Sequence, residues 1–308
     1  MTIRNIIRIG IGSVFIMAAI LKLIAIDEFE IYVYSFNVLN FLATSIFARL
    51  LVAGEFMLGL FMILKIHRRF TWNATMIVQM LFTLFLTYTA LFRNDANCHC
   101  FGDLVELSPL ESIAKNIVII GLLLFLAKDN QSKDNSHRSW LTWLIINCTL
   151  LIVFVVSPPD VIYKMIYSTE KEISTVDLYD SFDDVVGFNS QQPTADSLRT
   201  VAGGKLIVIV SSGCKYCQLG IKKLSMIMKK KGQDTDKINI FIWGSDEGIF
   251  DFIKETGTED YSYWRINPKQ AIDITYGRFP IFIWMEDGEV VSVGDFRDID
   301  ERQLANEN

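Results

Sequence analysis

The sequence predicts a bundle of five membrane-spanning α-helices followed by a soluble α/β domain. Two observations lead to this prediction. The first half of the 308-residue chain contains long apolar runs, and the net charge of −6 comes mostly from the second half. The second half also contains an apolar strand pattern that leads into Cys214-Lys215-Tyr216-Cys217 and then into a helical pattern. A chain of this length accommodates both parts.

Five apolar runs are long enough to cross a bilayer. The first follows Arg4 and Arg8 but has no clear small-residue cleavage site behind it, so we expect a retained span and not a cleaved signal peptide. The fourth has a marked start, because Ser108 is an N-cap residue, Pro109 takes the first helical position and Glu111 completes a capping box. Two consecutive prolines end the fifth. The runs cover residues 6–26, 41–64, 71–92, 109–127 and 140–156.

Lysine and arginine are unevenly distributed over the segments outside these runs. Basic residues precede the first run and fill the loops after the second and fourth, whereas the other two loops are poor in them. The positive-inside rule therefore places the N-terminus in the cytoplasm and everything after residue 156 outside. We expect a protein of the inner (cytoplasmic) membrane with a periplasmic soluble domain, in the compartment where disulfides persist. The inner basic residues are Arg4, Arg8, Lys65, Arg68, Arg69, Lys128, Lys133 and Arg138; Asp27, Glu28 and Glu30 mark the first outer loop, and Arg93 and Lys115 flank the second.

Charged residues also lie inside the apolar runs. Lys22 is near the outer end of the first run, and Arg49 and Glu55 are in the second. Charges at membrane depth are costly and are candidates for function. We expect Glu55 to pair with Lys22 or Arg49, either as a structural ion pair or as part of a functional site. Cys148, in the apolar fifth run, is expected to be a small packing residue.

One pair of cysteines lies in the loop between the third and fourth runs, in Asn97-Cys98-His99-Cys100. The predicted orientation places this pair outside, at the membrane surface. Cysteines one residue apart close a strained ring, and strained disulfides tend to be oxidising. His99 can supply positive charge or carry a proton, and Lys22 would favour a thiolate if it reached this surface. A redox or disulfide role is one interpretation; unrelated thiols, a metal site and long-range structural disulfides are the alternatives.

The other cysteine pair, Cys214 and Cys217, lies in the soluble part. The run 205–210 predicts a buried strand, and residues 218–231 repeat apolar positions at helical spacing. A helix that begins at the first cysteine lowers the pKa of that thiol. Cys214 would then attack a disulfide as a thiolate, and Cys217 would resolve the mixed disulfide. Half of a zinc site and a plain structural disulfide are the alternatives.

A strand that begins at a proline, and then a hairpin, follow this pair. Phe279-Pro280 precedes the apolar run 281–284, and Asp287-Gly288 is typical of a hairpin turn. A strand, a C-x-x-C helix, an X-Pro bond, a hairpin and a last helix together resemble the thioredoxin fold, from about residue 198 to the C-terminus. The resemblance implies a cis bond before Pro280 that faces the cysteine pair. Gly213 and Lys215-Tyr216 depart from the usual Trp-Cys-Gly-Pro-Cys of that fold, whose central dipeptide tunes the reduction potential.

The first half of the chain is similar to the MauE branch of the DoxX-like membrane proteins. The matching features are Arg8, Lys22, Glu55 and the loop Cys98-His99-Cys100-Phe101-Gly102, within about residues 3–128. Members named for methylamine utilisation are associated with the maturation of a disulfide-rich enzyme subunit, and the resemblance implies such a role. The expected parts are a MauE/DoxX-like four-helix membrane domain (1–130), a fifth transmembrane span (131–157), an extracytoplasmic linker (158–197) and a thioredoxin-like domain (198–308).

Together these features predict a thiol–disulfide oxidoreductase of the cell envelope, anchored in the lipid membrane. Cys214 and Cys217 would exchange disulfides with a cysteine-containing envelope protein, and Cys98 and Cys100 would relay electrons. No residue pattern identifies a cofactor; a quinone is suggested only by the similar architecture of vitamin K epoxide reductase-type fusions. Nothing in the chain is basic enough for nucleic acid. The alternatives are a MauE-type maturation or assembly factor whose cysteines are structural, and a transporter-like bundle that depends on its internal charges.

Overall fold

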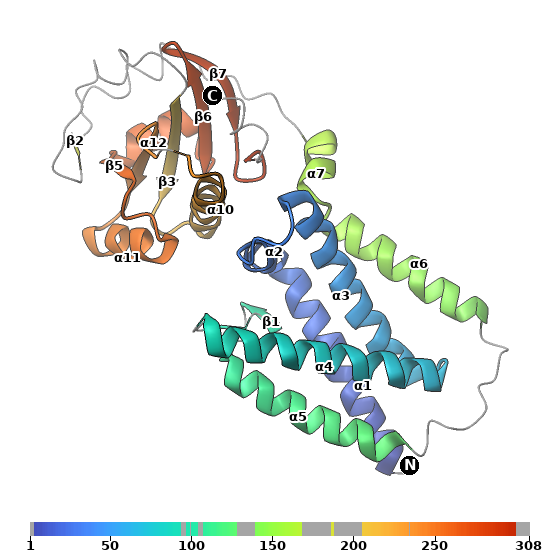
Figure 1. Cartoon of the computed structure of the whole chain (residues 1–308). Helices are drawn as coiled ribbons and strands as arrows, with labels where there is room; N and C mark the ends of the chain where they lie inside the picture. The colour runs from blue at the N-terminus through green and yellow to red at the C-terminus, as the bar shows by residue number, and fades with distance from the viewer. Residues whose placement is uncertain are drawn as a thin grey trace. The chain divides into compact units, whose positions relative to one another are not determined.

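The computed structural model of the chain describes residues 3–93, 97–98, 100–103, 107–127, 139–167, 186–187, 205–233 and 235–299. The chain divides into two compact units, one formed by Met1–Phe36 and Leu42–Pro159 and the other by Asn37–Phe41 and Asp160–Asn308. The first is helical and the second is built around a β-sheet, which confirms the predicted fold class (Figure 1). We call them the helical unit and the sheet unit.

In the described part of the chain, four helices are long and apolar enough to cross a membrane: α1 (Ile3–Ile24), α3 (Phe41–Leu64), α4 (Arg68–Phe92) and α5 (Pro109–Leu126). They coincide with the first four predicted spans, so the chain is a multi-pass membrane protein. The predicted capping box starts α5, where the Ser108 hydroxyl accepts the Glu111 N–H and the Glu111 carboxylate accepts the Ser108 N–H. The predicted fifth span is α6 (Ser139–Val156), which meets the same criterion only as a pair with α7 (Asp160–Tyr167) across a break.

The acidic connection between the first two spans contains a helix. This helix is α2 (Ile26–Tyr34), with Asp27 and Glu28 in the first turn, where acidic side chains favour the positive end of the helix dipole. Glu30 is 2% exposed, and its carboxylate pairs with the Arg49 guanidinium and accepts a hydrogen bond from the Ser45 hydroxyl at 3.0 Å. The burial of Glu30 was not predicted, because its partner Arg49 lies on α3, out of reach of a local sequence pattern.

Arg49 is fully buried and links three segments of the helical unit. Besides the pair with Glu30, its guanidinium donates to the Ser157 carbonyl and, at 2.9 Å, to the Pro158 carbonyl. These two residues directly follow α6, whose last carbonyls have no partner within the helix. Arg49 therefore binds backbone carbonyls just beyond the end of α6, whereas the partner of Glu55 is Lys22.

The backbones of α1 and α3 approach closely at two glycines. A Cβ atom on Gly12 would lie 2.7 Å from the Gly59 carbonyl oxygen, and one on Gly59 would lie 2.7 Å from the Gly12 carbonyl oxygen. Small residues allow this kind of contact between membrane helices. Buried apolar side chains of α1, α3, α4 and α5 form one cluster in the bundle. It consists of Ile11, Phe15, Met62, Met76, Ile119, Leu123 and Leu126.

The sheet unit contains one six-stranded mixed sheet in the order β2-β5-β4-β3-β6-β7. The central strand β3 is parallel to β4 and antiparallel to β6; β4 is parallel to β5, and β7 pairs antiparallel with β6. The strands are β2 (Val186–Gly187), β3 (Lys205–Ser211), β4 (Ile238–Trp243), β5 (Ser262–Arg265), β6 (Ile281–Glu286) and β7 (Glu289–Gly294).

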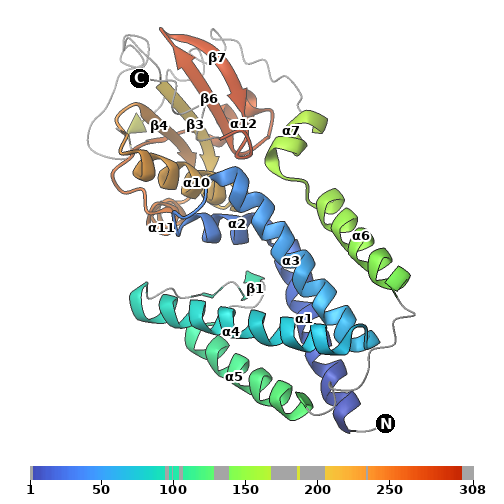
Figure 2. The same cartoon turned by 45° about the vertical axis from the view of Figure 1, so that its right-hand side comes forward.

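Helices cover both faces of this sheet (Figure 2). The helices are α10 (Lys215–Lys231), α11 (Asp246–Thr256) and α12 (Pro268–Thr275). Gly220 of α10 lies against the ring of Phe282, whereas Ala271 of α12 belongs to an apolar cluster with Ile283. Successive strand residues point to opposite faces, so α10 and α12 enclose the sheet between them.

The features predicted for the second half largely appear in the sheet unit. Pro280 directly precedes β6, and Asp287 and Gly288 have φ angles of 50° and 83°, as a type I′ hairpin turn requires. Strand β2 pairs with β5 from within the predicted linker, so the sheet begins upstream of residue 198. The last predicted helix and most of the linker lie outside the described residues.

We expect Arg49→Met to destabilise the helical unit, because it leaves the buried Glu30 carboxylate without its cation. Removing one partner of a buried ion pair costs about 3–5 kcal/mol. The thermal unfolding midpoint of the full chain in detergent should fall, and Arg49→Met combined with Glu30→Gln should recover part of the loss. Equal midpoints for the single and double variants would show that Glu30 does not depend on Arg49.

Candidate functional site

The first cysteine pair lies where β3 leads into α10. Cys214 is the N-cap residue of α10, and its sulfur accepts the backbone N–H of Cys217 at 3.3 Å. Cys214 is partly exposed, whereas Cys217, in the first turn, is fully buried. The thiol that a partner molecule can reach is therefore the one at the helix N-terminus.

These two thiols differ in acidity. The hydrogen bond from the Cys217 thiol, helped by the backbone N–H groups of Cys217 and Tyr216, lowers the pKa of Cys214 to about 7. Burial, and then the neighbouring Cys214 sulfur, raises the pKa of Cys217 above its usual range. Cys214 is thus half ionised near neutral pH while Cys217 stays protonated. This asymmetry fits the predicted attacking and resolving roles.

The peptide bond between Phe279 and Pro280 is cis and lies beside Cys214. The Phe279 carbonyl oxygen is 3.9 Å from the Cys214 sulfur, and the Phe279 ring packs against Trp243 with centroids 6.2 Å apart. The fold therefore brings the cysteine pair and Pro280 together from stretches more than sixty residues apart, as the thioredoxin resemblance implies.

A buried ion pair supports the helix that carries this site, and the sequence pattern did not reveal it. Lys223 is 1% exposed, and its ammonium donates to the Asp160 carboxylate at 3.0 Å and to the Phe296 carbonyl at 3.2 Å. The Phe296 ring in turn stacks on Tyr216, between the two cysteines, with centroids 5.2 Å apart. The lysine among the apolar positions of this helix was the available sign of a buried ion pair. Its partner Asp160, 63 residues away, is not indicated by any local pattern.

The second cysteine pair is buried at one end of the helical unit and is not open at the surface. Cys98 is 4% exposed and Cys100 is 6% exposed. The Cys98 sulfur lies 2.9 Å from the Ser112 hydroxyl of α5 and accepts the Cys100 N–H at 3.2 Å. Cys100 begins the short strand β1 (Cys100–Asp103), and His99 lies outside the described residues. A protein partner can reach these thiols only if this loop opens.

Gly102 fixes β1 against α1. Its φ is +64°, in the left-handed region, and a Cβ atom there would lie 2.6 Å from the Leu21 carbonyl oxygen and 3.1 Å from the Ala25 methyl group. Only glycine combines that conformation with so close an approach. The predicted Cys-x-Cys-Phe-Gly segment thus owes its position against α1 to its last residue, Gly102.

The second pair shows the same asymmetry in acidity as the first. The hydrogen bond with the Cys100 thiol, and a further one with Ser112, lower the pKa of Cys98 to about 6 against the opposing effect of burial. The pKa of Cys100 is raised, first by its hydrogen bond to Cys98 and then by burial. One thiolate and one protonated thiol therefore share this site at neutral pH.

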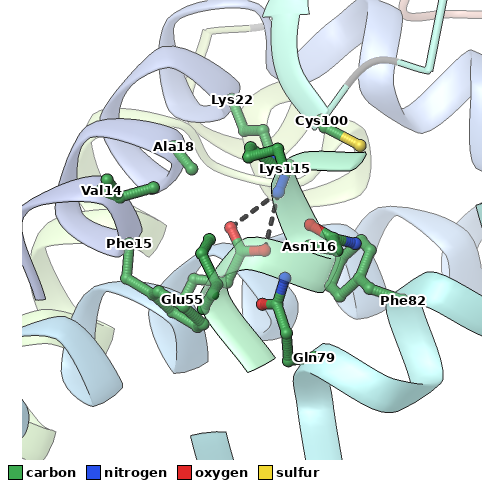
Figure 3. Close-up of a pocket in the computed structure, with 11 residues that line it drawn as sticks. Val14, Phe15, Ala18, Lys22, Glu55, Gln79, Phe82, Cys100, Lys115 and Asn116 are labelled. Carbon is green, nitrogen blue, oxygen red and sulfur yellow. Dashed lines mark hydrogen bonds and ion pairs between the residues drawn. The ribbon is translucent and has the colours of Figure 1, made fainter. Parts of the chain in front are cut away.

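A cavity of about 30 Å³, lined by apolar and polar side chains, lies beside Cys100 and has room for one or two water molecules. The Lys22 ammonium binds both oxygens of the Glu55 carboxylate at 2.7 Å within it (Figure 3). This pair settles the choice left open for Glu55. The residues around the cavity are Val14, Phe15, Ala18, Lys22, Glu55, Gln79, Phe82, Cys100, Lys115, Asn116 and Ile119.

The sequence pattern placed Lys115 only as a charge flanking the outer loop, but it lines this cavity. Ser112, Lys115 and Asn116 are spaced three and four residues apart, so they share one face of α5, toward the cysteines. Three polar residues at helical spacing in an apolar span were the signal for this face. Cys148, expected to be a small packing residue, is exposed on α6.

Comparisons with known proteins agree with the two-part organisation. Residues 1–128 match the family model described as methylamine utilisation protein MauE. The chain is 26% identical over 298 residues to protein TlpB of Flavobacterium psychrophilum, covering 83% of this chain and 81% of that protein.

Solved structures are similar to part of the chain. One is a secreted Mycobacterium tuberculosis disulfide oxidoreductase homologous to E. coli DsbE (10% identity, TM-score 0.33), of which 96% is covered by 42% of this chain. Another is a thioredoxin-related protein from Neisseria meningitidis serogroup B (18% identity, TM-score 0.30), of which 95% is covered by 40% of this chain. The thioredoxin-like assignment of the sheet unit rests on its own strand order, its C-x-x-C helix and the position of Pro280.

The acidity of Cys214 predicts selective alkylation near neutral pH. The folded, reduced chain should react with iodoacetamide at one site of the pair, with a rate that rises with pH to a half-maximum near pH 7, because only the thiolate attacks. Mass spectrometry after digestion identifies the alkylated residue. Preferential alkylation of Cys217, or a half-maximum near pH 9, would contradict the assignment.

Replacing Gly102 with Ala should loosen the loop over the second pair. A side chain in the left-handed conformation costs about 1–2 kcal/mol, which corresponds to roughly tenfold more frequent opening. In a chain with Ser at positions 148, 214 and 217, alkylation of Cys98 should therefore be about tenfold faster. Gly121→Ala is the matched control, because a Cβ atom there meets nothing within 4 Å.

Proposed function

We propose that this protein is a membrane-anchored thiol–disulfide oxidoreductase that exchanges disulfides with a cysteine-containing protein outside the cytoplasm. The observation that carries the proposal is the position of Cys214: a partly exposed thiol of lowered pKa at a helix N-terminus, hydrogen-bonded to the fully buried Cys217. A structural disulfide needs neither an exposed thiol nor this difference in acidity.

The exchange follows from these two thiols. The Cys214 thiolate attacks one sulfur of a partner disulfide, and the other partner sulfur leaves as a thiolate. Cys217 then gives up its proton and attacks the Cys214 sulfur, which releases the second partner thiolate and leaves a Cys214–Cys217 disulfide. The partner gains two electrons and the pair loses two. The reverse sequence oxidises a partner dithiol, and the Lys215-Tyr216 dipeptide influences which direction prevails.

The second pair extends the proposal to a relay. Cys98 and Cys100 have the same combination of an acidic and a non-acidic thiol, so they can exchange with the first pair by the same steps. Because both thiols are buried, exchange requires β1 to move away from α1. Opening of this loop is therefore part of the proposed relay.

The orientation is proposed from the distribution of basic residues. With the N-terminus in the cytoplasm and α6 crossing the bilayer as a fifth span, the sheet unit lies outside. An α-helix of 18 residues is about 27 Å long, close to the thickness of the hydrocarbon core. The expected location is the inner membrane, with Cys214 in an oxidising compartment.

A quinone does not fit the cavity beside Cys100. That cavity, about 30 Å³, is far smaller than the roughly 300 Å³ or more of a typical small-molecule site. No step of the proposed exchange is assigned to a quinone. Electrons that reach the second pair would pass on to a further protein disulfide, which is thereby reduced to a dithiol.

A maturation or assembly factor is the second candidate, favoured by the match of residues 1–128 to the family named for methylamine utilisation. In that case the bundle binds a disulfide-rich client and the cysteines are structural. The two candidates differ in their dependence on Cys214, which an assembly factor does not need.

We expect Cys217→Ser to accumulate mixed disulfides through Cys214, because the resolving thiol is missing. Intact cells are quenched with acid, treated with a mass-shifting alkylator and analysed on non-reducing gels. The adducts should disappear in Cys214→Ser/Cys217→Ser, and a maleimide that does not cross the inner membrane should label Cys214 in the parent. Absence of any adduct, with client maturation intact in Cys214→Ser, would favour the assembly factor.

The same experiment tests the relay. The redox state of Cys98 and Cys100 should differ between the parent and the Cys214→Ser variant. If that state is the same with and without Cys214, the two pairs do not exchange electrons and the sheet unit acts alone.

A further inference from the structure

Two positively charged side chains and one negatively charged side chain line the cavity beside Cys100. Lys22 and Glu55 compensate each other through their close ion pair. Lys115 is half-buried, and no carboxylate among the described residues lies within ion-pair distance of it. Its contact is the ring of Phe101, with the ammonium 4.3 Å from the centroid. A cation at the end of an apolar bundle needs an anion, since water solvates it only in part.

The cysteine pair supplies an anion at this place. Cys98 accepts hydrogen bonds from the Cys100 N–H and lies within reach of the Ser112 hydroxyl, and a thiolate is the form that such donors favour. Lys115 and Ser112 belong to the same face of α5, so one helix presents both a hydrogen-bonding group and a positive charge to the thiols. The electrostatic effect of Lys115 lowers the pKa of Cys98 and opposes the increase in the pKa of Cys100.

We propose that Lys115 is the counter-charge of the reduced Cys98–Cys100 pair and holds one of its sulfurs as a thiolate. Lys115 is a positioning residue in this role, because it acts through the thiols and not on a partner. The inference rests on the redox role proposed for this pair.

The counter-charge has a consequence for the redox balance. To close the disulfide, the Cys98 thiolate attacks a protein disulfide, Cys100 loses its proton and attacks the Cys98 sulfur, and the two partner sulfurs leave as thiolates, one of which takes up the Cys100 proton. Two electrons pass to the partner, and the site loses its anion. Lys115 is then uncompensated in the oxidised state. Stabilisation of the reduced state alone makes a dithiol pair more oxidising.

The other charged groups near the second cysteine pair lie on the helices around it. On α1 the facing charge is Lys22 and on α3 it is Glu55, already paired with each other. On α2, Asp27 and Glu28 lie in the first turn, and Glu30 is held by Arg49. On α4 the cavity residue is the neutral Gln79, and on α5 Glu111 is engaged with Ser108. Of the described basic groups that line the cavity, Lys115 is the one outside an ion pair.

The experiment measures thiol ionisation directly, in the full chain in detergent, with Ser at positions 148, 214 and 217. The ultraviolet absorbance of the thiolate is followed against pH, with Cys98→Ser as the blank. The midpoint of the parent is expected near pH 6. Lys115→Met should raise it by about one unit, a roughly tenfold smaller thiolate fraction below the midpoint, because a nearby positive charge is lost. Lys115→Arg should stay close to the parent.

Glu55→Gln gives the decisive comparison. It removes a negative charge and frees Lys22, so the midpoint should move down, opposite to Lys115→Met. A merely structural disturbance would move both variants in the same direction. Lys269→Met removes the same charge from an exposed position of α12 and should have no effect.

Equilibration with glutathione gives the second readout. Lys115→Met should shift the pair toward the disulfide, whereas Lys115→Arg should not. An unchanged midpoint in Lys115→Met, or shifts of equal sign in Lys115→Met and Glu55→Gln, would overturn the proposal. Because no exchange partner is involved, these outcomes are independent of whether Cys214 traps a client.

Discussion

The need to compensate charge inside an apolar bundle determines how the helical unit is built. Lys22 binds Glu55 and thereby joins α1 to α3, while Arg49 joins α3 to Glu30 of α2 and to the carbonyls that follow α6. A lone charge at these positions would cost several kcal/mol, so the helices hold the arrangement in which each finds its partner. The loop with the second cysteine pair lies at the end of the bundle where Lys22 binds Glu55.

The two cysteine pairs reach the same asymmetry by different means. At Cys214 the backbone contributes, because the residue caps a helix and its sulfur accepts an N–H of the first turn. At Cys98 the Cys100 thiol lowers the pKa most, followed by the Ser112 hydroxyl, the Cys100 N–H and the charge of Lys115. In both cases the second thiol is buried and keeps its proton, which separates the attacking sulfur from the resolving one. The common outcome supports a common chemistry for two unrelated backbones.

Local patterns predicted the parts of this structure that depend on local interactions. The four spans, the capping box at Ser108, the strand before Cys214 and the Asp287-Gly288 turn all follow from periodicity and from residues a few positions apart. The misses have partners far away along the chain. Glu30 is buried because Arg49 reaches it, and Lys223 because Asp160 does. Burial of the second cysteine pair likewise depends on α1 and α5, which a loop sequence does not reveal.

The contact between Gly12 and Gly59 limits how the bundle can move. At that point the backbones of α1 and α3 leave no room for a side chain, so the two helices cannot approach further there. Lys22 and Glu55 lie on the side of this contact toward the cysteine loop, ten residues along α1 and four along α3. Splaying of the helices would separate the ammonium from the carboxylate and widen the cavity at that same end. A bulkier residue at either glycine would hold the two backbones apart and would therefore disturb the ion pair beside the thiols.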